Sequence, residues 1–183
     1  PVRAGMPANT GEAGAMHRVA FFAGEPAPTG NRDRPTGDEM TDPLVIPCPH
    51  CNGLNRLPAE RLGDAPKCGR CKQDVLLSTP FELTEASYAS QIKGDLPLLV
   101  DIWADWCGPC KSFAPTFEEA ARKLAGRCRL AKLDSEANRN LAGQLGIRSI
   151  PSLLLFKNGR EVSRQAGAFP LQSLLEWLRN HGV

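Results

Sequence analysis

The sequence predicts an α/β protein in which a mixed β-sheet flanked by helices follows a small cysteine-rich segment. Apolar runs of strand length alternate with helical patterns from Phe81 to the carboxyl end, as is typical of βαβ folds. Two C-x-x-C pairs precede this region, and a third directly follows one of its most apolar runs. With 183 residues, 42% of them hydrophobic, the chain has room for one ordinary core and one small satellite domain.

The net charge and the cysteine content exclude several classes of function for this protein. The net charge of +2, from 22 basic and 20 acidic residues, creates no long-range field that would collect nucleic acid or anionic membrane. No apolar run approaches the roughly 20 residues that span a bilayer, and the first residues do not resemble a secretion signal. Three C-x-x-C pairs among seven cysteines fit a reducing compartment better than a secreted disulfide scaffold. We expect a cytoplasmic monomer that binds neither nucleic acid nor membrane.

Residues 1–42 are predicted to form a disordered amino-terminal extension. They contain many Gly and Pro residues and little apolar periodicity, so they bury too little surface to offset the entropy of ordering. Met40 lies just before the patterned sequence, and we hypothesise that it is the natural first residue.

Residues 43–79 are predicted to form a zinc ribbon. Two C-x-x-C knuckles at this separation suit one tetrahedral Zn²⁺ bound by four thiolates. The predicted ligands are Cys48, Cys51, Cys68 and Cys71. Gly53 and Gly69 are expected where the chain bends tightly around the metal. Because so short a segment has little core, metal binding should supply its folding free energy.

The ribbon leaves several interpretations open. A zinc site that only stabilises the fold is favoured over a site that releases zinc on oxidation. His50 lies between two ligands and is the alternative donor, although four thiolates already complete a set. Basic and acidic residues of the ribbon nearly balance, and no aromatic residue is interleaved, so the basic stripe of a nucleic-acid-binding ribbon is missing.

Residues 80–183 are predicted to form the α/β domain. Strands are expected in apolar runs, and helices where apolar residues recur every three or four positions. Thr84 is a helix cap, Pro115 a kink, and Asn158-Gly159 a two-residue hairpin turn. The expected strands are 81–83, 96–104, 129–134, 152–157 and 161–166. The expected helices are 84–92, the stretch from the third cysteine pair to 125, 138–145, and a last helix marked by leucines from 171 to 178.

The third cysteine pair is predicted to carry thiol–disulfide exchange. Cys107 and Cys110 follow the apolar strand where a helix begins, so they can close a small disulfide ring, and the helix terminus favours thiolate. Cys107, at the very start of the helix, is expected to be the more exposed nucleophile, and Cys110 to resolve the mixed disulfide. Metal binding by this pair is disfavoured because four other cysteines already form a complete set.

Two further residues carry hypotheses from their context. Asp101 interrupts the apolar strand, where desolvation would raise its pKa and suit it to exchange a proton with Cys110. A strand-end aspartate bound to a loop is an equally good interpretation from the residues alone. Cys128 is expected to be a small buried hydrophobe rather than a third redox centre.

Several motifs resemble the thioredoxin family across Phe81–Val183. They are Val-Asp-Ile-Trp-Ala-Asp-Trp-Cys-Gly-Pro-Cys-Lys, Ala-Lys-Leu-Asp, Gly-Ile-Arg-Ser-Ile-Pro-Ser-Leu-Leu-Leu-Phe-Lys-Asn-Gly and Ala-Gly-Ala. The four-cysteine ribbon resembles that of the bacterial thioredoxin-2 subgroup, which extends the likeness to everything after about Asp42. The resemblance implies a thioredoxin fold and a protein-disulfide reductase that uses a Cys107–Cys110 disulfide, acts on protein disulfides and is reduced by a flavin-dependent thioredoxin reductase.

The resemblance also implies roles for single residues. Asp101 would exchange the proton of Cys110, and Lys132 would lie close to Asp101 and modulate its ionisation. Gly108 and Pro109 would set a reducing couple, because oxidases and isomerases carry a histidine before the second cysteine. Ile150-Pro151 would be a cis peptide bond that faces the cysteines. The implied docking surface consists of Trp106, Gly108, Pro109, Ile150, Pro151 and Gly167.

The departures from the family pattern are small, and two of them, Ser149 and Ala166, bear on target choice rather than on the reaction. The departures are Ile102, Asp105, Ser149 and Ala166. Ser149 and Ala166 would lie beside the docking groove. Two other functions remain in competition: a binding module tethered by the ribbon, and a more oxidising disulfide oxidase or isomerase.

Overall fold

The computed structural model describes residues 42–183. The predicted disorder of residues 1–42 and the hypothesis about Met40 therefore fall almost entirely outside the described residues. The ribbon contains two antiparallel strands, β1 (Leu44–Pro47) and β2 (Leu54–Leu57), followed by the 3₁₀ turn η1 (Ala59–Arg61). No helix within residues 42–183 is both long and apolar enough to cross a membrane.

A mixed five-stranded sheet forms the centre of the α/β region, with strand order β3-β5-β4-β6-β7. Strands β3, β5 and β4 run parallel, whereas β6 and β7 are antiparallel to their neighbours. The bounds are β3 Phe81–Glu82, β4 Leu98–Trp103, β5 Arg129–Asp134, β6 Ser152–Lys157 and β7 Arg160–Ala166. Strand β4 lies in the middle of the sheet, and nearly all of its residues are buried. Its apolar sequence predicts this burial.

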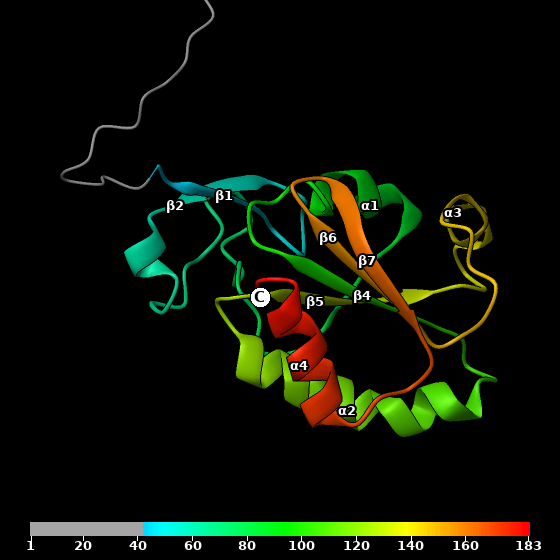
Figure 1. Cartoon of the computed structure of the whole chain (residues 1–183). Coiled ribbons are helices and arrows are strands. Elements are labelled where there is room, and N and C mark those ends of the chain that lie inside the picture. Colours follow the sequence, from blue (N-terminus) through cyan, green and yellow to red (C-terminus); the bar gives the residue numbers. More distant parts are fainter. Residues whose placement is uncertain (1–41) are drawn as a thin grey trace, which may run out of the picture. The chain divides into compact units, whose positions relative to one another are not determined.

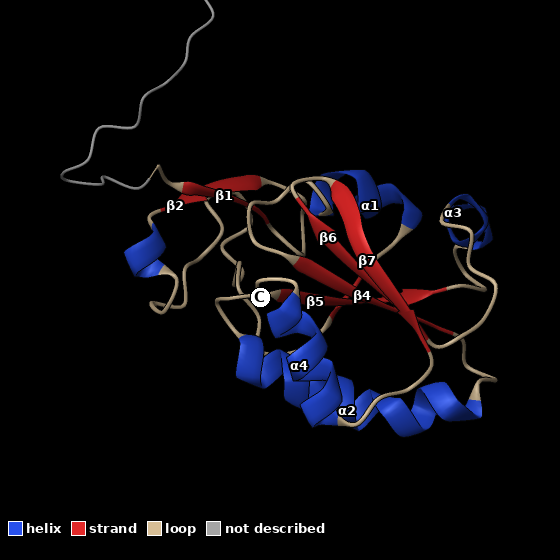
Figure 2. Cartoon of the chain, in the orientation of Figure 1, coloured by secondary structure: helices blue, strands red, loops and turns tan. Residues whose placement is uncertain are grey.

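Helices cover both faces of this sheet (Figures 1 and 2). Their bounds are α1 Glu85–Gln91, α2 Gly108–Leu124, α3 Arg139–Gln144 and α4 Leu171–Asn180. One core cluster joins α2 and α4 to the sheet through residues such as Phe117 and Leu178. A second cluster joins α1 and α3 to the other face through Tyr88 and Leu141. The predicted arrangement of a mixed sheet with helices on both faces is thus confirmed.

Local sequence signals explain most element boundaries. Thr84 caps α1 and forms a reciprocal capping box with Ser87. Asn158 and Gly159 both have positive φ, at 50° and 77°, as a tight hairpin between β6 and β7 requires. The helix α2 continues through Pro115.

Strand β4 begins at Leu98 rather than at the predicted Leu96, because Leu96 packs into the ribbon's apolar cluster with Ile46, Cys48 and Val75. The adjacent loop pairs with β1: Asp95 N–H donates to the Val45 carbonyl at 2.9 Å, and Val45 N–H donates to the Asp95 carboxylate at 2.6 Å. The ribbon is therefore attached to the loop that enters the central strand.

Candidate functional site

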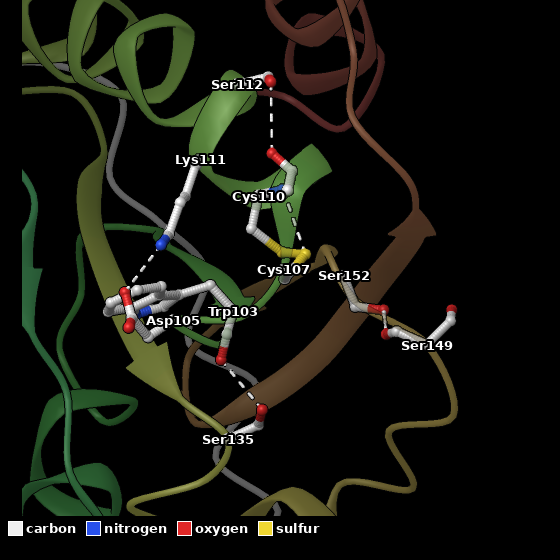
Figure 3. Close-up of a disulfide and its surroundings, with 10 residues drawn as sticks. Trp103, Asp105, Cys107, Cys110, Lys111, Ser112, Ser135, Ser149 and Ser152 are labelled. Carbon is white, nitrogen blue, oxygen red and sulfur yellow. Dashed lines mark hydrogen bonds and ion pairs between the residues drawn. A yellow bond between two sulfur atoms is a disulfide. The ribbon is translucent and has the colours of Figure 1, made fainter.

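The third cysteine pair forms a disulfide at the amino terminus of α2 (Figure 3). The sulfur atoms of Cys107 and Cys110 are 2.06 Å apart. Cys107 is the N-cap residue of α2, and its sulfur accepts a hydrogen bond from the Cys110 N–H at 3.2 Å. Because the first N–H groups of a helix lack partners within it, this position stabilises a thiolate at Cys107 once the disulfide is reduced.

The expected difference in exposure between the two cysteines is absent. Cys107 is 3% exposed and Cys110 is 2% exposed. Both side chains lie in a small cluster with Ala104, against which Trp103 and Ile150 pack. In the disulfide form this packing covers both sulfurs, so position in the helix rather than exposure distinguishes Cys107.

Asp101 lies on β4 with a fully buried carboxyl group. Neither carboxyl oxygen has a hydrogen-bond partner within residues 42–183. Burial raises the pKa of Asp101 to about 7, although the positive charge of Lys132 opposes this rise. The expected desolvation is confirmed, and the loop-bound alternative is not what the structure contains. A carboxyl with such a pKa can both accept and return a proton near neutral pH.

Lys132 lies on β5 directly opposite Asp101 in the parallel ladder. Its ammonium group is not bonded to that carboxyl but stands over the Trp103 ring, 4.5 Å from the ring centroid. An ammonium group in this position is attracted to the face of the indole. The sequence does not reveal this contact, because Lys132 and Trp103 lie on different strands and meet only through the pairing of β4 with β5.

The loop before β6 places an edge of backbone beside the disulfide. The Ile150-Pro151 peptide bond is cis, as the resemblance implied. Neither the N–H nor the carbonyl of Ile150 has a hydrogen-bond partner within the described residues. Gly167, with φ of 99°, donates its N–H to the Pro151 carbonyl at 2.8 Å, which holds the end of β7 against this loop. The free groups of Ile150 are therefore available to an extended peptide.

A cavity of about 510 Å³ adjoins this backbone edge. Trp106 lines it and is 71% exposed, which is unusual for so large an apolar side chain. Ile147 and Ser149 also line the cavity, and Figure 3 shows Ser149 on the loop beside the disulfide. Gly108 and Pro109 are the first two residues of α2, and a Cβ at Gly108 would meet nothing within 4 Å.

The remaining C-x-x-C pairs come together in the ribbon. The four sulfurs of Cys48, Cys51, Cys68 and Cys71 lie within 4.8 Å of one another. Two of the sulfur–sulfur distances are 3.6 and 3.7 Å, close to the roughly 3.8 Å edge of a tetrahedron with Zn–S bonds of about 2.3 Å. The N–H groups of His50 and Arg70 each point at a knuckle sulfur at 3.4 Å. This donor set and spacing fit a tetrahedral metal ion.

The glycines of the ribbon play a smaller part than expected. The positive φ angles in the knuckles belong to Asn52 and Lys72, at 58° and 64°, and not to Gly53 or Gly69. Each of these two residues follows the second cysteine of its pair, where the chain must turn away from the metal. Gly53 still eases a close approach, since a Cβ there would lie 3.3 Å from the Cys51 sulfur, which is a tight contact.

Cys128 lies apart from both sites. It is 3% exposed and belongs to the core cluster beneath α2 and α4. Burial raises the pKa of its thiol to about 12, so the reactive thiolate is scarce at neutral pH. The expectation of a small buried hydrophobe is confirmed.

A buried polar link near the ribbon was missed from the sequence. Gln91 and Arg129 are 1% and 5% exposed, and they contact each other between the ribbon and the start of β5. The only signal in the sequence was an arginine at the head of an apolar strand.

Comparison with known proteins identifies two matching regions. The thioredoxin family model matches residues 79–180, and the family described as thioredoxin 2, N-terminal, matches residues 47–73. Thioredoxin C-3 of Corynebacterium nephridii is 42% identical over 136 residues, which cover 74% of this chain and 93% of that protein. A thioredoxin of Alicyclobacillus acidocaldarius is 47% identical over 92 residues, with coverages of 50% and 88%. A thioredoxin of Haemophilus influenzae is 40% identical over 106 residues, with coverages of 57% and 99%.

Proposed function

Because the chain belongs to the thioredoxin family and is a thiol–disulfide reductase with an amino-terminal ribbon, we propose that Cys107 and Cys110 are the dithiol that carries its electrons. The observation that supports this most directly is the disulfide at the start of α2, where the Cys110 N–H bonds to the Cys107 sulfur. Electron transport in cell redox homeostasis follows from this role.

In the first step the Cys107 thiolate attacks one sulfur of a protein disulfide. A new S–S bond joins Cys107 to that sulfur while the substrate S–S bond breaks. The other substrate sulfur leaves with the electron pair and takes a proton. The helix terminus favours this step because it stabilises the attacking thiolate.

In the second step Cys110 resolves the mixed disulfide. Asp101 accepts the Cys110 proton, and a pKa of about 7 suits this carboxyl to the transfer. The Cys110 thiolate attacks the Cys107 sulfur and the bond between Cys107 and the substrate breaks. The second substrate sulfur leaves with the electron pair and takes a proton. The substrate has gained two electrons and two protons, and the protein holds the Cys107–Cys110 disulfide. Lys132, opposite Asp101 in the sheet, limits the rise of the Asp101 pKa.

Substrate docks on the surface beside the disulfide. The cis bond to Pro151 exposes the N–H and the carbonyl of Ile150. These two free groups pair with an extended segment of the substrate. The exposed Trp106 ring covers the apolar part of that segment. Gly167 and the Gly108-Pro109 turn complete the surface, and the absence of a histidine at position 109 favours a reducing couple.

The ribbon cysteines hold one Zn²⁺. Cys48, Cys51, Cys68 and Cys71 supply four thiolates, and the bound ion would neutralise them and stabilise the ribbon. Residues 43–79 then form the zinc ribbon and residues 80–183 the thioredoxin domain. We assign the protein to the cytoplasm as a monomer that binds neither nucleic acid nor membrane, and it receives electrons from a flavin-dependent thioredoxin reductase.

A reductase-coupled insulin-reduction assay tests the proposal. The wild-type protein should turn over, whereas Cys107→Ser should lose all activity because no thiolate attacks the substrate. Cys110→Ser should accumulate a mixed disulfide with substrate, which mass spectrometry detects. The exposed Asp105, with 89% of its side chain accessible, offers a control in Asp105→Asn, which should retain full turnover.

Three outcomes would overturn this function. Turnover that survives Cys107→Ser would place the chemistry elsewhere. A wild-type protein that binds disulfide peptides without reducing them would instead be a docking module. A reduction potential far above about −270 mV would indicate an oxidase or isomerase.

A further inference from the structure

Arg129 is a buried cation that no anion pairs with in the part of the chain that the structure describes. Its side chain opens β5 and is 5% exposed. None of the ion pairs within residues 42–183 includes Arg129. Its hydrogen-bond acceptors are the backbone carbonyl and side-chain carbonyl of Gln91, both neutral, and its guanidinium stands 5.0 Å from the centre of the Phe81 ring.

The other buried charge in the sheet does not serve as the partner. Arg129 pairs in register with Leu98, whereas Asp101 lies three residues further along β4. At about 3.3 Å per residue, the two positions are roughly 10 Å apart along the strand. Burying a charge costs free energy unless an opposite charge or hydrogen bonds compensate it. The neutral acceptors of Gln91 and the Phe81 ring compensate the Arg129 charge only in part, so an anion nearby would stabilise it further.

The contacts of Gln91 point to the ribbon as the source of that anion. Gln91, the last residue of α1, is 1% exposed. Its amide nitrogen donates to the Cys48 carbonyl at 2.8 Å and to the Asn52 side chain at 2.7 Å. Both acceptors belong to the first knuckle. Gln91 therefore links the guanidinium to the segment that carries the first two predicted metal ligands.

The charge of the metal centre has the required sign. Four thiolates around one Zn²⁺ carry a net charge of −2. Burial lowers the pKa of Arg129 to about 10, so the guanidinium remains protonated at neutral pH. A Cβ added at Gly94 would lie 2.7 Å from the Pro47 ring and 3.3 Å from the Arg129 guanidinium, so the guanidinium lies beside the residue that precedes Cys48.

We propose that Arg129 is the counter-charge of the tetrathiolate zinc centre, and that Gln91 positions both the guanidinium and the first knuckle. The proposal rests on the zinc site proposed above. It makes the first residue of β5 part of the metal site's surroundings, although β5 belongs to the α/β region. Zinc binding and the order of β5 then stabilise each other, because coupling between two sites is reciprocal.

Zinc affinity of full-length variants tests this role. Zinc content of the wild-type protein is measured first, and about one ion per chain establishes the site independently of Arg129. Competition with a chromogenic chelator then gives the affinity of each variant. Arg129→Met should bind zinc about 10- to 100-fold more weakly, the usual range when a group beside metal ligands is lost. Arg129→Lys, which keeps the charge, should remain within about threefold of the wild type on the same scale.

Arg127→Met is the matched control, because Arg127 is exposed and lies only two residues away. Its zinc affinity should equal that of the wild type. If Arg129→Met does not fold, Arg129→Gln replaces it, since glutamine keeps hydrogen-bond donors but carries no charge. A zinc affinity within twofold of the wild type in either neutral variant would overturn the proposal.

A measurement on the wild-type protein gives a second, independent test. The Arg129 N–H donates to the Pro97 carbonyl at 2.8 Å, so its hydrogen exchange reports on the start of β5. Removing zinc with a chelator should accelerate exchange at the start of β5 and leave β7, at the far edge of the sheet, unchanged. Exchange that does not change at β5 would contradict the coupling.

Discussion

Replacing the buried Asp101 by asparagine should stabilise the folded protein at neutral pH and slow its reduction of substrate. The folded state binds the Asp101 proton more tightly than the unfolded state, because burial raises the pKa from 3.8 to about 7. The stabilising effect of this proton is complete below pH 3.8 and is lost as the pH rises through about 7. Wild-type stability should therefore fall across this range, and Asp101→Asn should not share that fall.

The magnitude follows from the two pKa values. The raised pKa of Asp101 lowers the free energy of unfolding by about 4 kcal/mol at pH 8 and by about 2 kcal/mol at pH 5, since one pKa unit corresponds to about 1.4 kcal/mol. The new amide lacks partners, as the carboxyl oxygens do, and this costs about 1–3 kcal/mol at every pH. The amide cost cancels when the two pH values are compared. The gain in stability of the variant should thus be about 2–3 kcal/mol larger at pH 8 than at pH 5.

Urea unfolding of the oxidised proteins from pH 5 to pH 8 measures this difference. The ribbon is identical in both proteins, so its own pH dependence drops out when the two are subtracted. Asp105→Asn is the control: its carboxylate is exposed and pairs with Lys111 at 3.1 Å on the surface, where ion pairs contribute little. This control should follow the wild-type curve. Turnover with insulin, measured over the same pH range, should be lower for Asp101→Asn because Cys110 has lost its proton acceptor.

A stability gain that is the same at pH 5 and at pH 8 would refute the reasoning. It would mean that Asp101 has an ordinary pKa in the folded protein, and the proposed proton transfer would lose its physical basis.

Three further perturbations test other parts of the structure. Cys128 should resist alkylation in the native protein because it is buried and its pKa is about 12, so fast labelling at neutral pH would contradict the assignment. Trp106→Ala should lower kcat/KM for protein disulfides about tenfold with an unchanged unfolding midpoint, because the ring is exposed; equal kcat/KM would remove Trp106 from the docking surface. Gly94→Ala should destabilise the zinc-loaded protein by about 1–3 kcal/mol, because the new Cβ would lie 2.7 Å from the Pro47 ring. Gly63→Ala is its control, since nothing lies within 4 Å of that position, and equal unfolding midpoints for the two variants would contradict the close approach.

Most of the secondary structure followed from local signals. The capping box at Thr84 and the Asn158-Gly159 turn depend on only a few neighbouring residues, so the sequence predicts them. The start of β4 was not, because Leu96 has the apolar character of the strand but is drawn into the ribbon's cluster. A strand pattern does not reveal which of two cores a residue at its end will join.

The same distinction holds for the candidate site: local patterns predicted some of its features, and contacts between distant segments decided the others. The cysteine spacings predicted both the disulfide and the clustered thiols, because two intervening residues bring paired sulfurs to one point. The predicted exposure of Cys107 was wrong, since Ile150, from a distant loop, packs against its cluster. The position of the Lys132 ammonium over Trp103 was likewise invisible, because the two residues meet only through the pairing of β4 and β5.

Chain order alone therefore determined the chemistry available to this protein: two thiols at a helix start, four more in paired knuckles, and an acid within an apolar strand. Folding decided the electrostatic surroundings of those groups. Arg129 and Gln91 are 38 positions apart, yet they meet beside the ribbon. The reason is physical: hydrogen-bond geometry and spacing act along the chain, whereas charge balance and desolvation depend on which distant segments pack together.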